Sequence, residues 1–174
     1  MKRLLVYILL LITLFVLQGT LFSGISFAGT VPNLLLVLTV SLGLMRGEKT
    51  GMAIGFFSGL LMDIFTGSTI GFLALVYMYL GYGSGSFNKI FYPEDIKLPM
   101  FMITICDLLY GFIYYVIMFL MRGRLNIGNY FLHVILPECV YTILVTVVLY
   151  PIILLLDNLL KKDELRRNKK FVSR

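Results

Sequence analysis

The sequence is poor in the residues from which most catalytic and metal sites are built. Its 174 residues include one histidine, two cysteines and no tryptophan. This set offers neither a nucleophile and base pair nor a metal-ligand spacing. Both cysteines, Cys106 and Cys139, lie inside apolar runs, where a thiol behaves as a small hydrophobic side chain. The sequence therefore predicts no enzyme activity, no cofactor and no metal site.

Charged residues are scarce as well. They make up 14% of the chain, whereas hydrophobic residues make up 59%. An average globular protein has about 25% charged residues. A helix that crosses a bilayer needs about 20 mainly apolar residues. The composition thus predicts an all-α integral membrane protein with about six transmembrane helices and no separate soluble domain.

Six apolar segments are the candidates for these helices. They are Leu4–Phe22, Pro32–Met45, Gly51–Phe65, Ile70–Phe87, Pro99–Met121 and Phe131–Leu156. The second and third are short, because about fifteen residues cover only ~22 Å of a ~30 Å hydrocarbon core. We expect them to be sheltered by their neighbours, extended by loop residues, or folded as a re-entrant pair.

The distribution of lysine and arginine predicts the orientation. If both termini are cytoplasmic, thirteen of these residues lie inside and only Arg122 and Arg124 lie outside, as the positive-inside rule requires. The first segment also imitates a signal peptide, because "SFA" precedes Gly29. Cleavage there would leave five helices. The apolar run extends to Phe22, however, and this favours a retained helix.

The C-terminal residues predict a cytoplasmic tail. We divide the chain into a helical bundle, residues 1–156, and a basic tail, residues 157–174. The tail cations are Lys161, Lys162, Arg166, Arg167, Lys169, Lys170 and Arg174. Their position directly after an apolar run predicts an anchor with affinity for anionic lipid, with protein binding as the alternative. The net charge of +6 is therefore not taken as a sign of nucleic-acid binding.

Glycines recur every fourth residue in the third segment. Gly51, Gly55, Gly59 and Asp63 form one stripe on a helix, with Phe56 beside it. Such spacing lets another backbone approach closely, so the stripe predicts a helix-packing face. The later segment "GYGSGS" lacks the Lys-Ser/Thr pair of a phosphate loop. We interpret it as a flexible exit or a tight packing point.

Asp63 is an acid inside an apolar segment, and three roles remain open for it. It could cap a helix or accept hydrogen bonds from exposed backbone amides. It could contact a partner protein, or it could relay a proton or ion.

Three further polar residues lie within the apolar runs, namely Asp107, His133 and Glu138. Pro137 cannot donate a backbone hydrogen bond and tends to kink its helix, which predicts a polar cluster around His133 and Glu138. That cluster is either functional or internally satisfied. For Asp107 we expect a structural role, with hydrogen bonds donated by nearby tyrosines, Tyr110 and Tyr114.

The segment "VPNLLLVLTVSLGLMRGEKTGMAIGFFSGLLMDIFTGSTIGFLALVYMYLGYGSG", residues 31–85, resembles the MreD family. The matching residues are Pro32 with Leu34–Leu36, Arg46 and Gly47 in the turn, Gly55, Phe56, Gly59, Leu60 and Asp63 in the third segment, and Gly67 and Gly71 before the fourth. Asn33 stands where that family commonly has Asp, although Asn can still cap a helix.

This resemblance implies a non-enzymatic subunit of the bacterial cell-elongation machinery (elongasome) in the cytoplasmic membrane. Such proteins associate with MreC, a bitopic protein, and work beside MreB, RodA and a class B penicillin-binding protein. They support rod shape and lateral peptidoglycan synthesis, as a scaffold. The resemblance also implies a fold similar to the substrate-binding subunits of energy-coupling-factor transporters. The glycine stripe is then a candidate docking face for the membrane helix of an MreC-like partner.

That implied fold also supplies the main alternative, a substrate-binding subunit of a vitamin-type transporter. Such subunits usually present an Ala-x-x-x-Ala face on the first helix, but no small residue lies between Leu4 and Leu17. No tryptophan is available to line a vitamin pocket. An ion-coupled carrier using Asp63, Asp107 and Glu138 is a third possibility, although no internal repeat is detectable.

Overall fold

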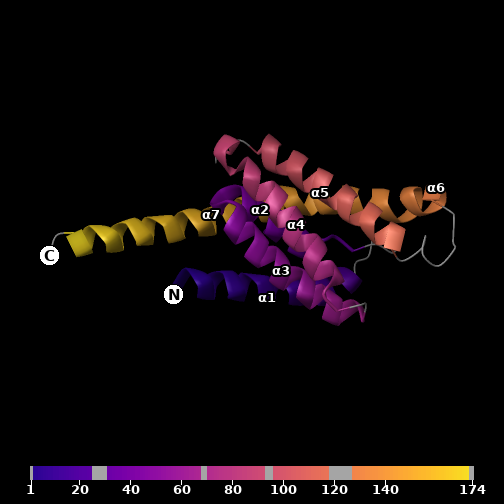
Figure 1. Ribbon diagram of the computed structural model, residues 1–174, viewed down its shortest axis with the longest axis horizontal. Coiled ribbons are helices and arrows are strands. Elements are labelled where there is room, and N and C mark those ends of the chain that lie inside the picture. The colour runs from indigo at the N-terminus through magenta and orange to yellow at the C-terminus, as the bar shows by residue number, and fades with distance from the viewer. Residues whose placement is uncertain (1, 25–30, 68–69, 93–95, 118–126, 173–174) are drawn as a thin grey trace.

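The computed structural model describes residues 2–24, 31–67, 70–92, 96–117 and 127–172, and every regular element in these ranges is helical (Figure 1). The α-helices are α1 (Lys2–Gly24), α2 (Leu34–Arg46), α3 (Glu48–Thr66), α4 (Phe72–Ser86), α5 (Lys97–Tyr115), α6 (Ile127–Tyr130) and α7 (Leu136–Val172). A 3₁₀ turn, η1 (Phe87–Ile90), follows α4, and a π-helical turn, η3 (Phe131–Ile135), precedes α7. The prediction of an all-α protein is therefore confirmed.

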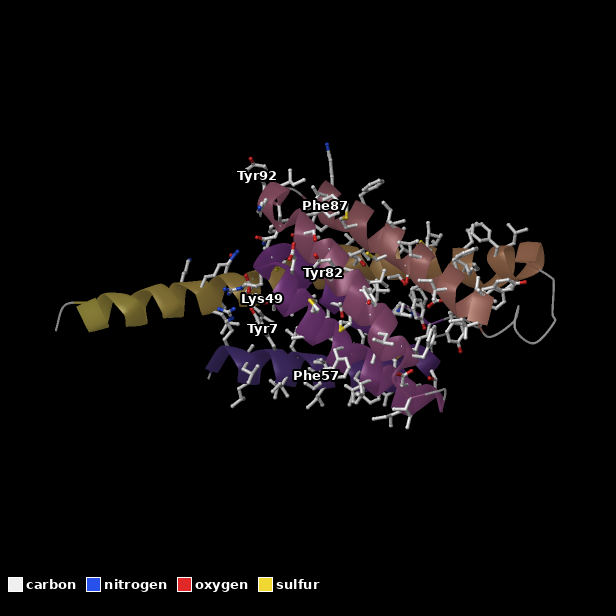
Figure 2. All side chains as sticks on the ribbon, viewed as in Figure 1. Tyr7, Lys49, Phe57, Tyr82, Phe87 and Tyr92 are labelled. Atoms are coloured by element: carbon white, nitrogen blue, oxygen red, sulfur yellow. The ribbon has the colours of Figure 1, made fainter. Side chains whose placement is uncertain are left out.

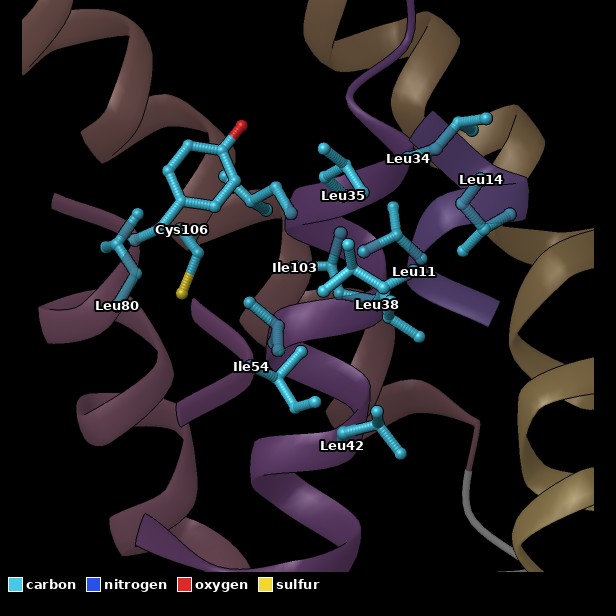
Figure 3. Close-up of a cluster of buried hydrophobic side chains, with 14 of the residues drawn as sticks. Leu11, Leu14, Leu34, Leu35, Leu38, Leu42, Ile54, Leu80, Ile103 and Cys106 are labelled. Atoms are coloured by element: carbon cyan, nitrogen blue, oxygen red, sulfur yellow. The ribbon is translucent and has the colours of Figure 1, made fainter. Parts of the chain in front are cut away.

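Helix α2 is the core of the molecule. Every residue from Leu34 to Met45 is buried, and α1, α3, α4, α5 and α7 all pack against it. Figure 3 shows its leucines among side chains of the surrounding helices. A helix that is apolar on all sides is stable only when it is enclosed. At 13 residues it is ~20 Å long and too short to cross a bilayer, so the expectation that it is sheltered by neighbours is correct.

Three helical segments are long and apolar enough to cross a membrane: Arg3–Thr20, Lys97–Tyr115 and Phe131–Lys162. Helices α2 and α4 are shorter than these segments. Helix α3 is less apolar, because it carries the charged residues Glu48, Lys49 and Asp63. The described helices therefore support three long spans, where the sequence predicted about six. Helices α2, α3 and α4 instead pack mainly on one another.

A tight turn joins α2 to α3. Gly47 has φ +89°, which L-residues with a Cβ rarely adopt, and its N–H donates to Gly43 O at 2.7 Å. Asn88 in η1 donates its side-chain amide to Leu44 O at 2.5 Å. Two of the unpaired carbonyls at the end of α2 are thus satisfied, and α3 can fold back beside α2.

Helix α7 runs without interruption across the predicted end of the bundle at residue 156. Its 37 residues span ~55 Å, and Figure 1 shows its C-terminal part extending beyond the other helices. The side chains of Arg166, Arg167, Lys169 and Lys170 lie outside the described part of the chain. The division into bundle and lipid-binding tail stays a prediction.

Candidate functional site

The glycine stripe of α3 faces α4. A Cβ added at Gly59 would lie 2.6 Å from Ala74 Cα, and one added at Gly51 or Gly55 would collide with the backbone of Gly81 or Tyr77. The spacing of these glycines thus allows two backbones to touch, as expected where small residues drive helix association in membranes.

Because α4 covers the stripe, Gly51, Gly55 and Gly59 offer no space for a partner helix. The docking face predicted there is replaced by an internal packing interface. Phe56 and Phe57 lie elsewhere on α3 and are 38% and 58% exposed, and Figure 2 labels Phe57. Their rings meet edge to face at 5.6 Å. These aromatic residues, unlike the glycines, are open to the surroundings.

The "GYGSGS" segment belongs to this same interface. It forms the last turns of α4, and a Cβ added at Gly85 would lie 2.5 Å from Glu48 Cα at the start of α3. A Cβ at Gly81 would collide with Gly51 O. Of the two interpretations of this segment, tight packing is the one that the contacts support.

Asp63 binds the first turn of α4. The fully buried carboxylate accepts hydrogen bonds from Gly71 N at 2.8 Å, Leu73 N at 3.0 Å and Ala74 N at 3.1 Å. These amides are unpaired within the helix, and the positive end of the helix dipole favours the negative charge. Of the three roles open for Asp63, these contacts support that of a hydrogen-bond acceptor for exposed backbone amides.

The turn that carries these donors needs glycine. Gly67 ends α3 at φ +62° and Gly71 precedes α4 at φ +98°, both in the left-handed region that glycine occupies without strain. Both glycines belong to the motif of the family resemblance. Leu60, another motif residue, is partly buried one turn before Asp63.

Asn33 connects three helices at the start of α2. Its Oδ1 accepts from Leu36 N at 3.2 Å and from the Tyr77 hydroxyl at 2.7 Å, and its backbone N–H donates to Thr142 Oγ1 at 3.2 Å. The neutral amide therefore caps α2, as the sequence predicts, and also ties it to α4 and α7. Pro32 beside it is buried.

Asp107 is a buried acid of α5, and the Thr142 hydroxyl lies beside it. Its side chain is 3% exposed, and among the described residues no donor reaches either carboxyl oxygen with good hydrogen-bond geometry. The expected hydrogen bonds from Tyr110 and Tyr114 are therefore wrong. Glu138 of α7 is partly buried, whereas His133, which the sequence predicts to cluster with Glu138, is exposed in η3.

A second acid, Asp157 of α7, forms a network that the sequence reasoning missed. Asp157 is 1% exposed. Its Oδ1 accepts from Arg46 Nε at 2.6 Å and from the Tyr7 hydroxyl at 2.9 Å, and its Oδ2 lies 3.4 Å from Lys161 Nζ. Figure 2 shows Tyr7 reaching toward α7. Arg46 of the Arg-Gly motif thus joins α1, α2 and α7, and Asp157 belongs to the packed bundle.

These features define a class of protein, an all-helical membrane protein in which buried polar side chains hold apolar helices together. Among the described residues, no three His, Cys, Asp or Glu side chains gather in a way that could hold a metal ion.

The family follows from comparison. The family model described as rod shape-determining protein MreD matches residues 1–160, so the chain belongs to the MreD family. Members of this family are non-catalytic membrane proteins with a role in determining rod shape. No curated protein and no solved structure matches the chain. The similarity to energy-coupling-factor subunits stays a prediction.

Proposed function

We propose that this chain is a non-catalytic scaffold subunit of the bacterial cell-elongation machinery. It binds an MreC-like bitopic protein in the cytoplasmic membrane and works beside MreB, RodA and a class B penicillin-binding protein. In this role it supports rod shape and lateral peptidoglycan synthesis, with both termini in the cytoplasm. The observation that carries the proposal is the family match over residues 1–160.

The packing of polar residues supports a scaffold. Asp63, Asn33 and Asp157 each satisfy their charge or hydrogen bonds with groups on other helices or at a helix end. Such contacts fix the relative positions of helices, and a rigid surface loses little conformational freedom when a partner binds.

We place the docking surface for the partner's membrane helix on α3, at Phe56 and Phe57. The two rings are exposed, and large aromatic side chains contribute strongly to contact surfaces. They lie on the helix whose glycine stripe packs against the backbone of α4, so their position is well fixed.

The first experiment is affinity purification of the C-terminally tagged protein from native membranes in mild detergent, followed by mass spectrometry. Recovery of an MreC-like protein with cell-wall synthases supports the proposal. Recovery of a coupling membrane subunit with ATPases would contradict it and identify a transporter subunit.

A second experiment tests the surface. The double variant Phe56→Ala/Phe57→Ala should reduce recovery of the MreC-like partner at least about tenfold, as expected for removal of interface anchors. The control is Phe101→Ala on α5, because Phe101 is also exposed (63%) but lies on another helix. Equal recovery with the double variant and the control would rule out this surface while leaving the scaffold proposal intact.

A further inference from the structure

The buried faces of α1 and α7 meet at a hydrogen bond between two named side chains. In α1, Tyr7, Leu11 and Leu14 are each 6% exposed, and their spacing places them on one face of the helix. In α7, Ile153 and Asp157 are 2% and 1% exposed and also share a face. The Tyr7 hydroxyl donates to Asp157 Oδ1 at 2.9 Å. The two buried faces are therefore turned toward each other at this contact.

One helical turn closer to each chain end, both faces carry a cation. Arg3 is four residues before Tyr7, and its guanidinium carbon lies 5.9 Å from the centre of the Tyr7 ring. Lys161 is four residues after Asp157, and its Nζ lies 3.4 Å from Asp157 Oδ2. Residues four apart share a face of a helix, so Arg3 and Lys161 stand on the two faces that meet. Two positive charges thus flank the same contact.

The carboxylate at this contact does not balance the positive charge around it. Asp157 already pairs with Arg46, whose Nε lies 2.6 Å from Asp157 Oδ1. Arg3 and Lys161 therefore flank an acid whose charge Arg46 neutralises. Residues 157–174 contain seven cations and three acids, so the chain beyond Asp157 adds positive charge to this end of the molecule. A cluster of cations of this kind attracts an anion.

These cations stand where two candidate membrane spans end. One span begins at Arg3 and another ends at Lys162. On α7, Ile152, Leu155 and Leu159 are each more than half exposed, and they share one face with the exposed Lys162. In a membrane such an apolar stripe contacts lipid chains, and a cation at its end reaches the level of the lipid headgroups. The anion available at this depth is a lipid headgroup.

We propose that α1 and α7 together bind one anionic phospholipid at the membrane boundary. Its phosphate lies between Arg3 and Lys161, and its acyl chains lie along the exposed apolar stripe of α7. Arginine and lysine are common phosphate-binding side chains, and basic sites between membrane helices bind anionic headgroups. This site differs from the predicted lipid anchor in the tail, because it needs Arg3 from the other end of the chain. It stands independently of the proposed scaffold function, since it involves no partner protein.

The test is thermal unfolding of the purified full-length protein in detergent, with added phosphatidylglycerol or phosphatidylcholine. The unfolding temperature should rise by about 3–6 °C at a phosphatidylglycerol concentration about tenfold above the dissociation constant. Native mass spectrometry should detect one bound phosphatidylglycerol. Phosphatidylcholine carries the same phosphate without net negative charge and should cause a smaller rise. Inorganic phosphate has no acyl chains and should cause no rise.

Two variants locate the lipid. Arg3→Gln and Lys161→Gln should each weaken phosphatidylglycerol binding about fivefold, as expected for the loss of one cation beside an anionic lipid. Both variants should fold, because Arg46 still pairs with Asp157. The matched control Lys49→Gln removes an exposed lysine at the start of α3, which Figure 2 labels. Lys49 is three residues after Arg46, and this control should bind the lipid like the unaltered protein.

A second control separates the site from the tail. The variant Arg166→Gln/Arg167→Gln/Lys169→Gln/Lys170→Gln removes four tail cations. It should keep the phosphatidylglycerol-dependent rise and the single bound lipid.

Four results would overturn the proposal. One is an equal rise with phosphatidylglycerol and phosphatidylcholine. Another is a response of Arg3→Gln or Lys161→Gln that needs no more lipid than the unaltered protein. The third is loss of the response in the fourfold tail variant, which would place the lipid on the tail. The last is an equal rise with inorganic phosphate, which would make this a site for free anions.

Discussion

Arg46 and Asp157 are 111 residues apart in the sequence, yet Arg46 Nε lies 2.6 Å from Asp157 Oδ1. Both side chains are almost fully buried, at 9% and 1% exposed. The pair joins the end of α2 to α7, and the Tyr7 hydroxyl adds α1 to the same carboxylate. An arginine that belongs to a turn motif thus also holds the bundle together at this end.

Removing one member of this pair should strongly destabilise the protein. Asp157→Asn removes the negative charge that Arg46 Nε contacts in the interior, and breaking such a buried pair typically costs about 3–5 kcal/mol. Thermal unfolding of the detergent-purified protein measures the loss. Lys161→Gln is the control, because Lys161 is 39% exposed at 3.4 Å from the same acid and should change stability by less than about 1 kcal/mol. Equal losses in both variants would contradict a buried-pair role.

Asp63 should not tolerate replacement by asparagine. Both carboxylate oxygens accept backbone N–H groups. An Asn amide would direct N–H toward N–H at one of these positions, at a cost of about 1–3 kcal/mol. Asp63→Leu should cost more. Unfolding temperatures compare both with Thr66→Val, because Thr66 is an exposed residue of the same helix and this change removes only the hydrogen bond from its hydroxyl to Met62 O. An unchanged Asp63→Asn variant would contradict the cap.

Two glycines on neighbouring helices should respond in opposite directions to alanine. Gly59→Ala places a Cβ against the Ala74 backbone and should destabilise the protein by about 1–3 kcal/mol through overpacking. Gly83→Ala in α4 meets nothing within 4 Å, and alanine favours helix over glycine by about 1 kcal/mol, so stability should rise or stay equal. The same unfolding assay compares them. Destabilisation by both would mean that close packing is not the cause.

The Tyr77 hydroxyl should contribute to the stability of the protein only through its hydrogen bond to Asn33. Tyr77→Phe keeps the fully buried ring but removes the 2.7 Å hydrogen bond to Asn33 Oδ1, a loss of about 1 kcal/mol. Tyr82→Phe, on an exposed position of the same helix, is the control and should have no measurable effect. In Asn33→Ala, where the acceptor is already gone, adding Tyr77→Phe should cost little more. Full additivity of the two changes would show that the hydroxyl acts elsewhere.

Periodicity predicted the features that lie within one helix. The four-residue spacing of Gly51, Gly55 and Gly59 indicates a packing face, and the unbroken apolar run of α2 indicates a sheltered helix. Asp63 could be placed at a helix end because its partners lie within eleven residues along the chain.

What the sequence did not reveal depends on which helices are neighbours. Periodicity gives a face but not its partner, so α4 was not foreseen as the occupant of the glycine stripe. Asp157 looked like part of a charged tail, since its partners Tyr7 and Arg46 are 150 and 111 residues away. Nearby tyrosines in the sequence were assigned to Asp107, but short separation along a helix does not aim a hydroxyl at an acid. A carboxylate four residues before Lys161 inside an apolar run was the one available signal for Asp157.

The two ends of α2 are fastened to the same helix. Asn33 N contacts Thr142 Oγ1 at one end, and Arg46 contacts Asp157 at the other. The thirteen-residue step along α2 and the fifteen-residue step along α7 correspond to ~20 Å and ~22 Å of helix, so the two parallel helices share one register. A shift of α2 by one helical turn along α7 would break both contacts at once. The contacts at its two ends therefore allow the central helix α2 only one axial alignment relative to α7.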